Sequence, residues 1–254
     1  MTPAAWTLKL ELAAWRRAGR RPRLWWRDDD AGLEDSNLEL LLDLASETGV
    51  PIALAVIPAE VSTQTVVQVN ACRRATVLQH GVDHRNAEAD TAPRQFPRGE
   101  APNVIAQKLI DGAERLNGFN RRLPVYVPPW NAFDDNLLEA LPLAGLEGLS
   151  AFGDARSCDV VVRVDAHLDI LRWAGGARFK GEGRLLGRLT RLLAARRRTG
   201  AWDEPIGLLS HHRDHDPAAW RFLALFLTNS LEWADWLDAG RLFSPQSQPR
   251  MAHA

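Results

Sequence analysis

The sequence has few of the features that mark disulfide-rich, cysteine-metal or membrane-spanning proteins. It contains only two cysteines, Cys72 and Cys158, whose separation matches neither a disulfide framework nor a cysteine metal site. No apolar run approaches the roughly 20 residues that span a bilayer. Charged residues interrupt the apolar positions of residues 1–23, unlike those of a signal peptide. We therefore expect free thiols and a cytoplasmic protein.

An excess of charge and a phosphate-binding turn are also missing. The 31 Lys and Arg residues nearly balance the 32 Asp and Glu residues, so the total charge gives no reason to expect a nucleic acid or membrane partner. No glycine-rich turn follows the first expected strand, which argues against a nucleotide site there. We interpret the basic segment 181–198 as an outer helix whose apolar side packs inward.

Strand and helix patterns alternate along the chain. The pattern of residues 3–18 predicts an amphipathic helix. Ser36 is expected to cap a second helix, which ends at Gly49. Residues 244–254 are expected to be a frayed tail. Strand patterns include residues 24–27, 51–58, 75–80, 123–130 and 205–211, with short candidates at 147–152, 159–165 and 168–173. The continuous apolar run 51–58 is typical of a strand buried on both faces. This order predicts one α/β domain over residues 1–254, with parallel strands in either a barrel or an open sheet.

Polar residues gather where the expected strands end, which is where parallel α/β folds place their active sites. Five of the seven histidines follow only two strands. The residues concerned are Asp28, Asp29 and Asp30, then His80 and His84, then Trp130 and Asn131, then His211, His212 and His215. The polar segment 81–103 is too long for a routine connection and is expected to be a functional loop.

These residues fit a catalytic metal centre. Two histidines and one carboxylate leave coordination positions open for water and substrate, and on a helix the spacing of His80 and His84 would place both rings on one face. Three adjacent carboxylates are tolerable if a divalent cation neutralises one and another is used for proton transfer. A tryptophan packs in a core or stacks on a sugar ring, and for Trp130 both interpretations stay open.

The order of the stretches RDDDAG, HGVDH, VPPWN, HLDILRW and LLSHH resembles the polysaccharide deacetylases, which are metal-dependent de-N-acylases of sugar chains. The resemblance spans residues 24–212. It is strongest to a divergent bacterial branch with RDDD, HxxxH, PPWN and SHH motifs. It implies a distorted (β/α)-barrel of about seven parallel strands, a divalent ion expected to be zinc (Zn²⁺), and a carbohydrate or small N-acylated substrate.

The resemblance also implies roles for individual residues. Asp29 corresponds to the general base and His211 to the general acid. Asp30, His80 and His84 correspond to the metal ligands. Asp28–Asp29 is the alternative register of the acidic pair, and His212 is the alternative acid. The residues expected to bind substrate are Trp130, Asn131, Arg27 and His212, and Asp169 with Trp173 resembles the family's fourth motif.

Two positions depart from the family's pattern. Val127 stands where the third motif opens with an arginine that pairs with the base, and Asn131 stands where that motif ends in glycine. Asn tolerates a left-handed backbone, as glycine does. Arg27 is the candidate for supplying the missing charge. The substrate and the tuning of the base are therefore the parts of the resemblance that these departures affect most.

Two other functions remain open from the sequence. Two histidines and a carboxylate also form the site of iron oxygenases, although the alternation of strands and helices argues against their usual fold. The loss of the third-motif arginine is also compatible with a decayed deacetylase that binds only a glycan or a partner. Retention of both a base and an acid favours the hydrolase, because a binding module needs neither.

Overall fold

A curled sheet of parallel strands forms the centre of the protein. The computed structural model describes residues 2–88, 92–154 and 158–244, so most of the predicted tail lies outside the described residues. Within these ranges the sheet has nine strands, in the order β6-β5-β4-β3-β2-β1-β10-β7, with β11 beside β1. Their bounds are β1 (Arg23–Ala31), β2 (Ile52–Val56), β3 (Ala75–His80), β4 (Arg122–Val127), β5 (Gly148–Leu149), β6 (Val162–Arg163), β7 (Ala166–Asp169), β10 (Ile206–Ser210) and β11 (Asp235–Trp236).

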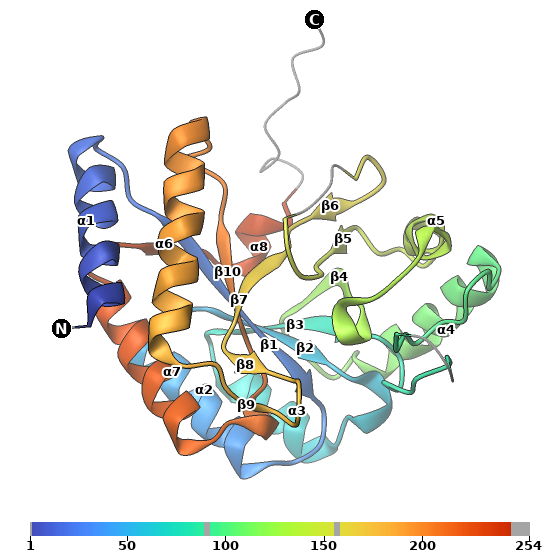
Figure 1. Cartoon of the computed structure of the whole chain (residues 1–254). Helices are drawn as coiled ribbons and strands as arrows, with labels where there is room; N and C mark the ends of the chain where they lie inside the picture. The colour runs from blue at the N-terminus through green and yellow to red at the C-terminus, as the bar shows by residue number, and fades with distance from the viewer. Residues whose placement is uncertain (1, 89–91, 155–157, 245–254) are drawn as a thin grey trace, which may run out of the picture.

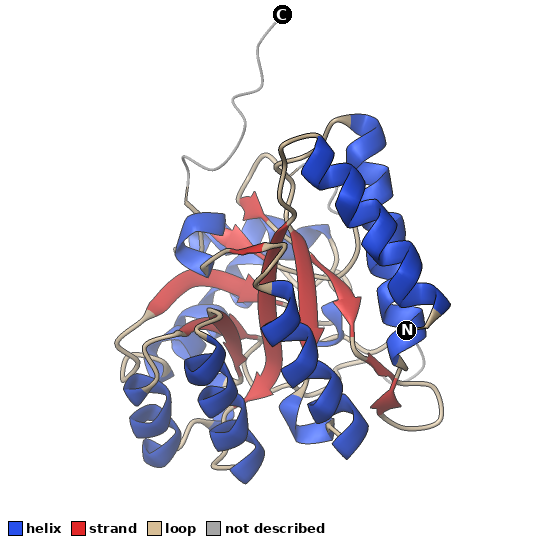
Figure 2. Cartoon of the chain, turned by 90° about the vertical axis from the view of Figure 1, so that its left-hand side faces the viewer, coloured by secondary structure: helices blue, strands red, loops and turns tan. Residues whose placement is uncertain are grey.

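The sheet curls into a half-barrel with helices around it (Figures 1 and 2). The helices are α1 (Pro3–Arg17), α2 (Ser36–Thr48), α3 (Thr63–Ala71), α4 (Pro102–Arg115), α5 (Asp135–Leu143), α6 (Glu182–Thr199), α7 (Pro217–Ser230) and α8 (Ala239–Leu242). Three short 3₁₀ helices are η1 (Pro58–Glu60), η2 (Pro129–Asn131) and η3 (His212–Asp214), and β8 (Leu171–Arg172) forms a hairpin with β9 (Arg178–Phe179). None of the helices in the described ranges is long and apolar enough to cross a membrane.

The predicted distorted barrel of parallel strands is confirmed, although the sheet has nine strands rather than about seven. The extra strands include β5, β6 and β11, which have two residues each; β5 and β6 lie within the short strand candidates 147–152 and 159–165, and β11 was not predicted. Two local predictions were wrong. The side chain of Asp35, not Ser36, caps α2, and β1 continues through the three aspartates to Ala31. Gly49 does end α2, with φ 72.

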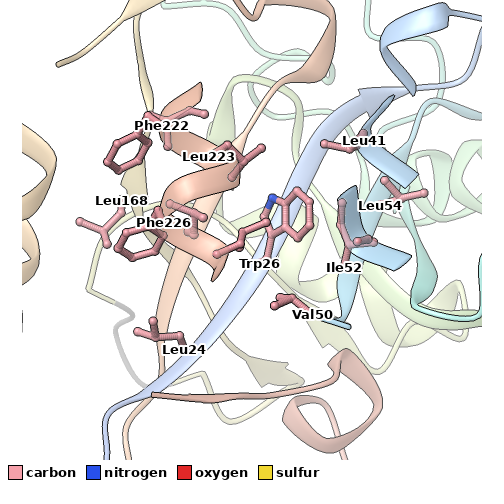
Figure 3. Close-up of a cluster of buried hydrophobic side chains, with 14 of the residues drawn as sticks. Leu24, Trp26, Leu41, Val50, Ile52, Leu54, Leu168, Phe222, Leu223 and Phe226 are labelled. Carbon is pink, nitrogen blue, oxygen red and sulfur yellow. The ribbon is translucent and has the colours of Figure 1, made fainter. Parts of the chain in front are cut away.

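The side chains of β1 alternate between two apolar cores. Leu24 and Trp26 face the outer helices, where Trp26 packs between Leu223 of α7 and Leu41 of α2 (Figure 3). Trp25 faces the interior of the barrel, among small and branched residues of β2, β3 and β4. Trp25 and Trp26 are each 1% exposed, which agrees with the core interpretation of these two tryptophans. The same alternation sets the directions of the aspartates that follow.

Candidate metal centre and active site

A β-bulge in β1 determines the directions in which the three aspartate side chains point. The pairing of β1 with β2 shifts register between Asp28 and Ala31, and Asp30 has a left-handed backbone with φ 70. In a regular strand Asp29 would face the barrel interior, and Asp28 and Asp30 would both face the outer helices. A bulge reorients one side chain. Asp30 therefore lines the same cavity as Asp29, while Asp28 does not.

Asp28 is fully buried behind the site. It accepts hydrogen bonds from Ser210 Oγ at 2.5 Å and from His212 N at 3.1 Å, and His212 Nδ1 lies 2.5 Å from its other oxygen. Burial raises the pKa of this carboxyl, but the charge and hydrogen bond of His212 reverse this, so the pKa lies below its ordinary value. The Asp28–Asp29 register does not fit this position. His212 is 0% exposed and does not line the cavity described below, so its position supports neither of its predicted roles.

Asp30, His80 and His84 converge on one point. Asp30 Oδ1 lies 3.1 Å from His80 Nε2 and 3.3 Å from His84 Nε2, and all three ligand atoms lie within 4.8 Å of one another. Tetrahedral ligands about 2.1 Å from a zinc ion are separated by about 3.4 Å, so the set fits such an ion. No other group of three or more potential ligands within the described ranges is as close together.

The histidines of this set come from the end of β3 and the loop after it. His80 Nδ1 donates to the Val127 carbonyl at 3.0 Å, which leaves Nε2 as the ring nitrogen directed at the site. His84 has φ 54, and its ring centroid lies 4.5 Å from that of Trp130. The pair is therefore not on one helix. The turn at Gly81, with φ 62, returns the chain to the site.

The pKa values of the two histidines shift in opposite directions. Burial lowers the pKa of His80, but its hydrogen bond to Asp30 and the charges of Asp29 and Asp30 outweigh this and raise it. Burial and the charge of His80 lower the pKa of His84. Burial raises the pKa of Asp30, and the hydrogen bond and charge of His80 then bring it well below its ordinary value. The site therefore keeps an ionised carboxylate beside the two histidines.

Arg27 holds Asp29 from the same strand. Its Nε donates to Asp29 Oδ1 at 2.8 Å and its Nη2 to Oδ2 at 3.0 Å, a bidentate ion pair with both residues buried. Its remaining donors bind Asn131 Oδ1 at 2.7 Å, Ser150 and the Ala151 carbonyl. Arg27 is 0% exposed and does not line the cavity described below, so its position does not support the predicted contact with substrate. It lies instead where it can supply the charge that Val127 cannot.

His211 faces Asp29 across the site. Its Nε2 lies 3.9 Å from Asp29 Oδ2, and its ring centroid lies 4.6 Å from that of Trp173. Its Nδ1 is buried and has no hydrogen-bond partner among the described residues. Asp169 accepts hydrogen bonds from Leu171 N and from Trp173 Nε1, both at 2.8 Å. Asp169 thus fixes the indole that packs against His211.

These groups line one cavity of about 620 Å³. Its lining is Asp29, Asp30, His80, His84, Trp130, Asn131, Phe152, Asp169, Trp173 and His211. Trp130, Phe152 and Trp173 are 37%, 42% and 47% exposed, which makes them accessible apolar walls. The sequence analysis missed Phe152. It follows the two-residue strand β5, and its position at a strand end was the only signal that could have identified it.

The comparisons with known proteins agree on the fold. No model of a known protein family matches the chain, and no curated protein sequence matches it. Solved structures do match. A family 4 acetyl xylan esterase from Clostridium thermocellum, in complex with a cobalt ion, is 14% identical, with 89% of this chain and 93% of that chain covered and a TM-score of 0.58.

Two deacetylases give the same result. A peptidoglycan N-acetylglucosamine deacetylase is 13% identical, with 88% of each chain covered and a TM-score of 0.54. A polysaccharide deacetylase from Bacillus cereus is 15% identical, with 90% of this chain and 95% of that chain covered and a TM-score of 0.53. The predicted resemblance is therefore confirmed in the architecture: the chain has the fold of the family 4 carbohydrate esterases and polysaccharide deacetylases.

Proposed function

We propose that the protein is a metal-dependent hydrolase that removes an N-acyl group, in the first place N-acetyl, from a carbohydrate or a related amide. One observation carries this proposal. Three ligands for a divalent ion converge at the wall of a cavity in which Asp29 and His211 face each other at 3.9 Å. A binding protein has no need for a carboxylate and an imidazole beside a metal centre in one cavity.

Asp30, His80 and His84 would hold the ion. When bound there, a divalent ion such as zinc lowers the pKa of a water molecule and polarises the acyl oxygen of the substrate. The donor set of one carboxylate and two neutral imidazoles suits zinc, and His80 already directs Nε2 at the site because Nδ1 binds the Val127 carbonyl.

The other residues would move protons and position the substrate. Asp29 takes a proton from the attacking water as the bond from the water oxygen to the acyl carbon forms. Arg27 keeps that carboxylate oriented and compensates its charge in the buried site. His211 donates a proton to the amine nitrogen as the carbon–nitrogen bond breaks, so a carboxylic acid and a free amine leave. Trp130 and Trp173 would enclose the acyl group and the sugar ring.

An assay of acetate release tests this function. The metal-free protein is reconstituted with zinc, cobalt or iron and incubated with N-acetylated oligosaccharides, with O-acetylated oligosaccharides as the comparison. We expect the wild-type protein to hydrolyse the amides. The control variant Asp29→Asn should bind the metal but release no acetate. Metal binding without hydrolysis of any acylated substrate would instead support a glycan-binding or partner-binding protein. Oxygen-dependent turnover by the iron form alone would support the oxygenase.

A further inference from the structure

The net charge of −1 conceals an uneven distribution of charge over the outer helices. α1 and α6 carry nine Lys and Arg residues but only two acidic residues, Glu11 and Glu182. Their net charge is therefore +7, and the remainder of the chain carries −8. The two helices lie side by side on one flank of the barrel (Figure 1). The total charge gave no reason to expect such a surface.

Most of these cations form no ion pair with the residues that the structure describes. Arg197 pairs with Glu11 at 2.7 Å, and Arg196 turns inward to backbone carbonyls. Eight exposed cations on or beside the two helices form no ion pair with any residue that the structure describes: Lys9, Arg16, Arg17, Arg20, Arg184, Arg188, Arg191 and Arg198. The four on α6 recur at helical spacing on its outer side, where like charges destabilise a helix. An anionic partner would remove this repulsion.

The outer side of α1 adds apolar groups to the charge. Leu8 and Trp15 face inward, while Trp6 and Leu10, one turn apart, are 52% and 49% exposed. Lys9 and Arg17 are exposed on the same helix. Exposed Trp and Leu beside Lys and Arg are typical of helices that lie in the plane of a membrane interface.

Two adjoining cavities flank α1 on the side of α7. One, of about 400 Å³, is mainly apolar and includes Leu8, Phe222 and Trp233 in its lining. The other, of about 320 Å³, is lined by Lys9, Arg16, Arg20 and Trp233, with Glu232 as its one carboxylate. Trp233 is common to both. An apolar hollow that continues into a basic one fits an amphiphile with an anionic head group.

We propose that the face formed by α1 and α6 docks on an anionic phospholipid bilayer. Trp6 and Leu10 enter the head-group region, and the unpaired Arg and Lys side chains bind lipid phosphates, for which the arginine fork is well suited. The phosphates of a nucleic acid could also pair with these cations. A phosphate backbone, however, has no apolar chain that could pack against Trp6 and Leu10 or fill the apolar cavity. The proposal does not depend on the hydrolase activity, because none of these residues lines the active-site cavity.

Vesicle sedimentation of the full chain tests the proposal. We expect binding to vesicles of phosphatidylcholine with phosphatidylglycerol, no binding to phosphatidylcholine alone, and weakening with salt. Replacing the four α6 arginines by Gln should lower the partition coefficient at least about tenfold, because each basic residue near an anionic surface contributes. Trp6→Ser with Leu10→Ser should lower it as well. A matched control removes four exposed cations from other elements: Arg73→Gln, Arg74→Gln, Arg98→Gln and Arg115→Gln.

Each outcome decides the question once circular dichroism has verified that the variants are folded. The proposal is supported if the α6 and α1 variants lose binding and the control variant keeps it. It fails if the wild-type chain ignores the anionic vesicles, or if the control loses as much binding as the α6 variant. Stronger binding to duplex DNA than to vesicles would assign the face to nucleic acid. The wild-type chain could also form a dimer and bind no vesicles. If Trp6→Ser with Leu10→Ser then dissociates the dimer, the face binds a second copy of the chain.

Discussion

Gly81 joins the two histidines of the proposed metal centre, and we predict that Gly81→Ala is far more damaging than the same change at Gly99. Gly81 has φ 62, and a Cβ there would lie 1.9 Å from Gln95 Oε1 and 2.6 Å from Pro129 Cγ. Gly99 has φ 75, but a Cβ there would meet no heavy atom within 4 Å. The left-handed backbone is therefore common to both positions, and only Gly81 adds a steric conflict.

The expected losses of stability differ by a few kcal/mol. The left-handed backbone costs an alanine about 1–2 kcal/mol at either position. At Gly81 the methyl group also displaces the Gln95 oxygen that accepts a hydrogen bond from Val82 N at 2.9 Å, which costs about 1 kcal/mol more. Overpacking against the rigid Pro129 ring adds about 1–3 kcal/mol. The free energy of unfolding should fall by roughly 3–6 kcal/mol for Gly81→Ala and about 1–2 kcal/mol for Gly99→Ala.

Two measurements check this prediction. Urea denaturation gives the free energy of unfolding of each variant, and competition with a chromophoric chelator gives its zinc affinity. Because Gly81 sets the path from His80 to His84, zinc affinity should fall by about 10-fold or more in Gly81→Ala and stay unchanged in Gly99→Ala. Equal losses of stability in the two variants, or an unchanged zinc affinity in Gly81→Ala, would refute the reasoning.

Three further predictions use the same structure. Arg27→Met should lower the free energy of unfolding by about 3–5 kcal/mol, because it leaves the buried Asp29 carboxylate without its cation. Arg27→Lys keeps a positive charge and should lose less stability. Equal urea denaturation curves for the two variants would contradict this. His211→Asn should lower kcat on an N-acetyl sugar by about 10²–10⁴ but far less on 4-nitrophenyl acetate, whose leaving group needs no proton; equal losses would argue against a general acid. Burial and Arg196 lower the pKa of His167 to about 4, against 6.5 for the ordinary group. The unfolded chain therefore takes up the proton first, and stability should fall by about 1.4 kcal/mol per pH unit as pH drops from 6.5 to 4. His167→Gln should remove that part of the slope in urea denaturation at pH 7 and pH 5.

The fold was predictable because long apolar strands and periodic helices dominate the chain. β2 is buried along its whole length, as its continuous apolar run predicts. The two-residue strand β11 was missed, since two residues carry no periodicity. The Asp35 cap was missed because Asp35 and Ser36 are both good capping residues, and only backbone geometry decides between them.

The site was predictable in its residue types and less so in its directions. The strand ends pointed to the cavity residues Asp29, Asp30, His80, His84 and His211. The bulge at Asp30 could not be seen, because nothing in three identical residues indicates where the alternation breaks. The burial of His212 could not be seen either, since a His-His pair does not reveal which ring the strand turns outward. Both depend on the pairing of β1 with its neighbours.

The Arg27–Asp29 pair has a consequence for how this site tolerates change. Two residues apart on one strand, these side chains become neighbours as soon as three residues are extended, before any other part of the barrel assembles. An arginine from β4 would meet Asp29 only if the intervening strands β2 and β3 kept their register. Here the cation that pairs with the proposed base, Arg27, lies on the same strand as the base. β4 therefore contributes only the Val127 carbonyl, which any residue at that position can provide. The side chain at position 127 therefore has no role in the proposed reaction. A sequence pattern that requires arginine at this position would not match this site, because here the positive charge comes from β1.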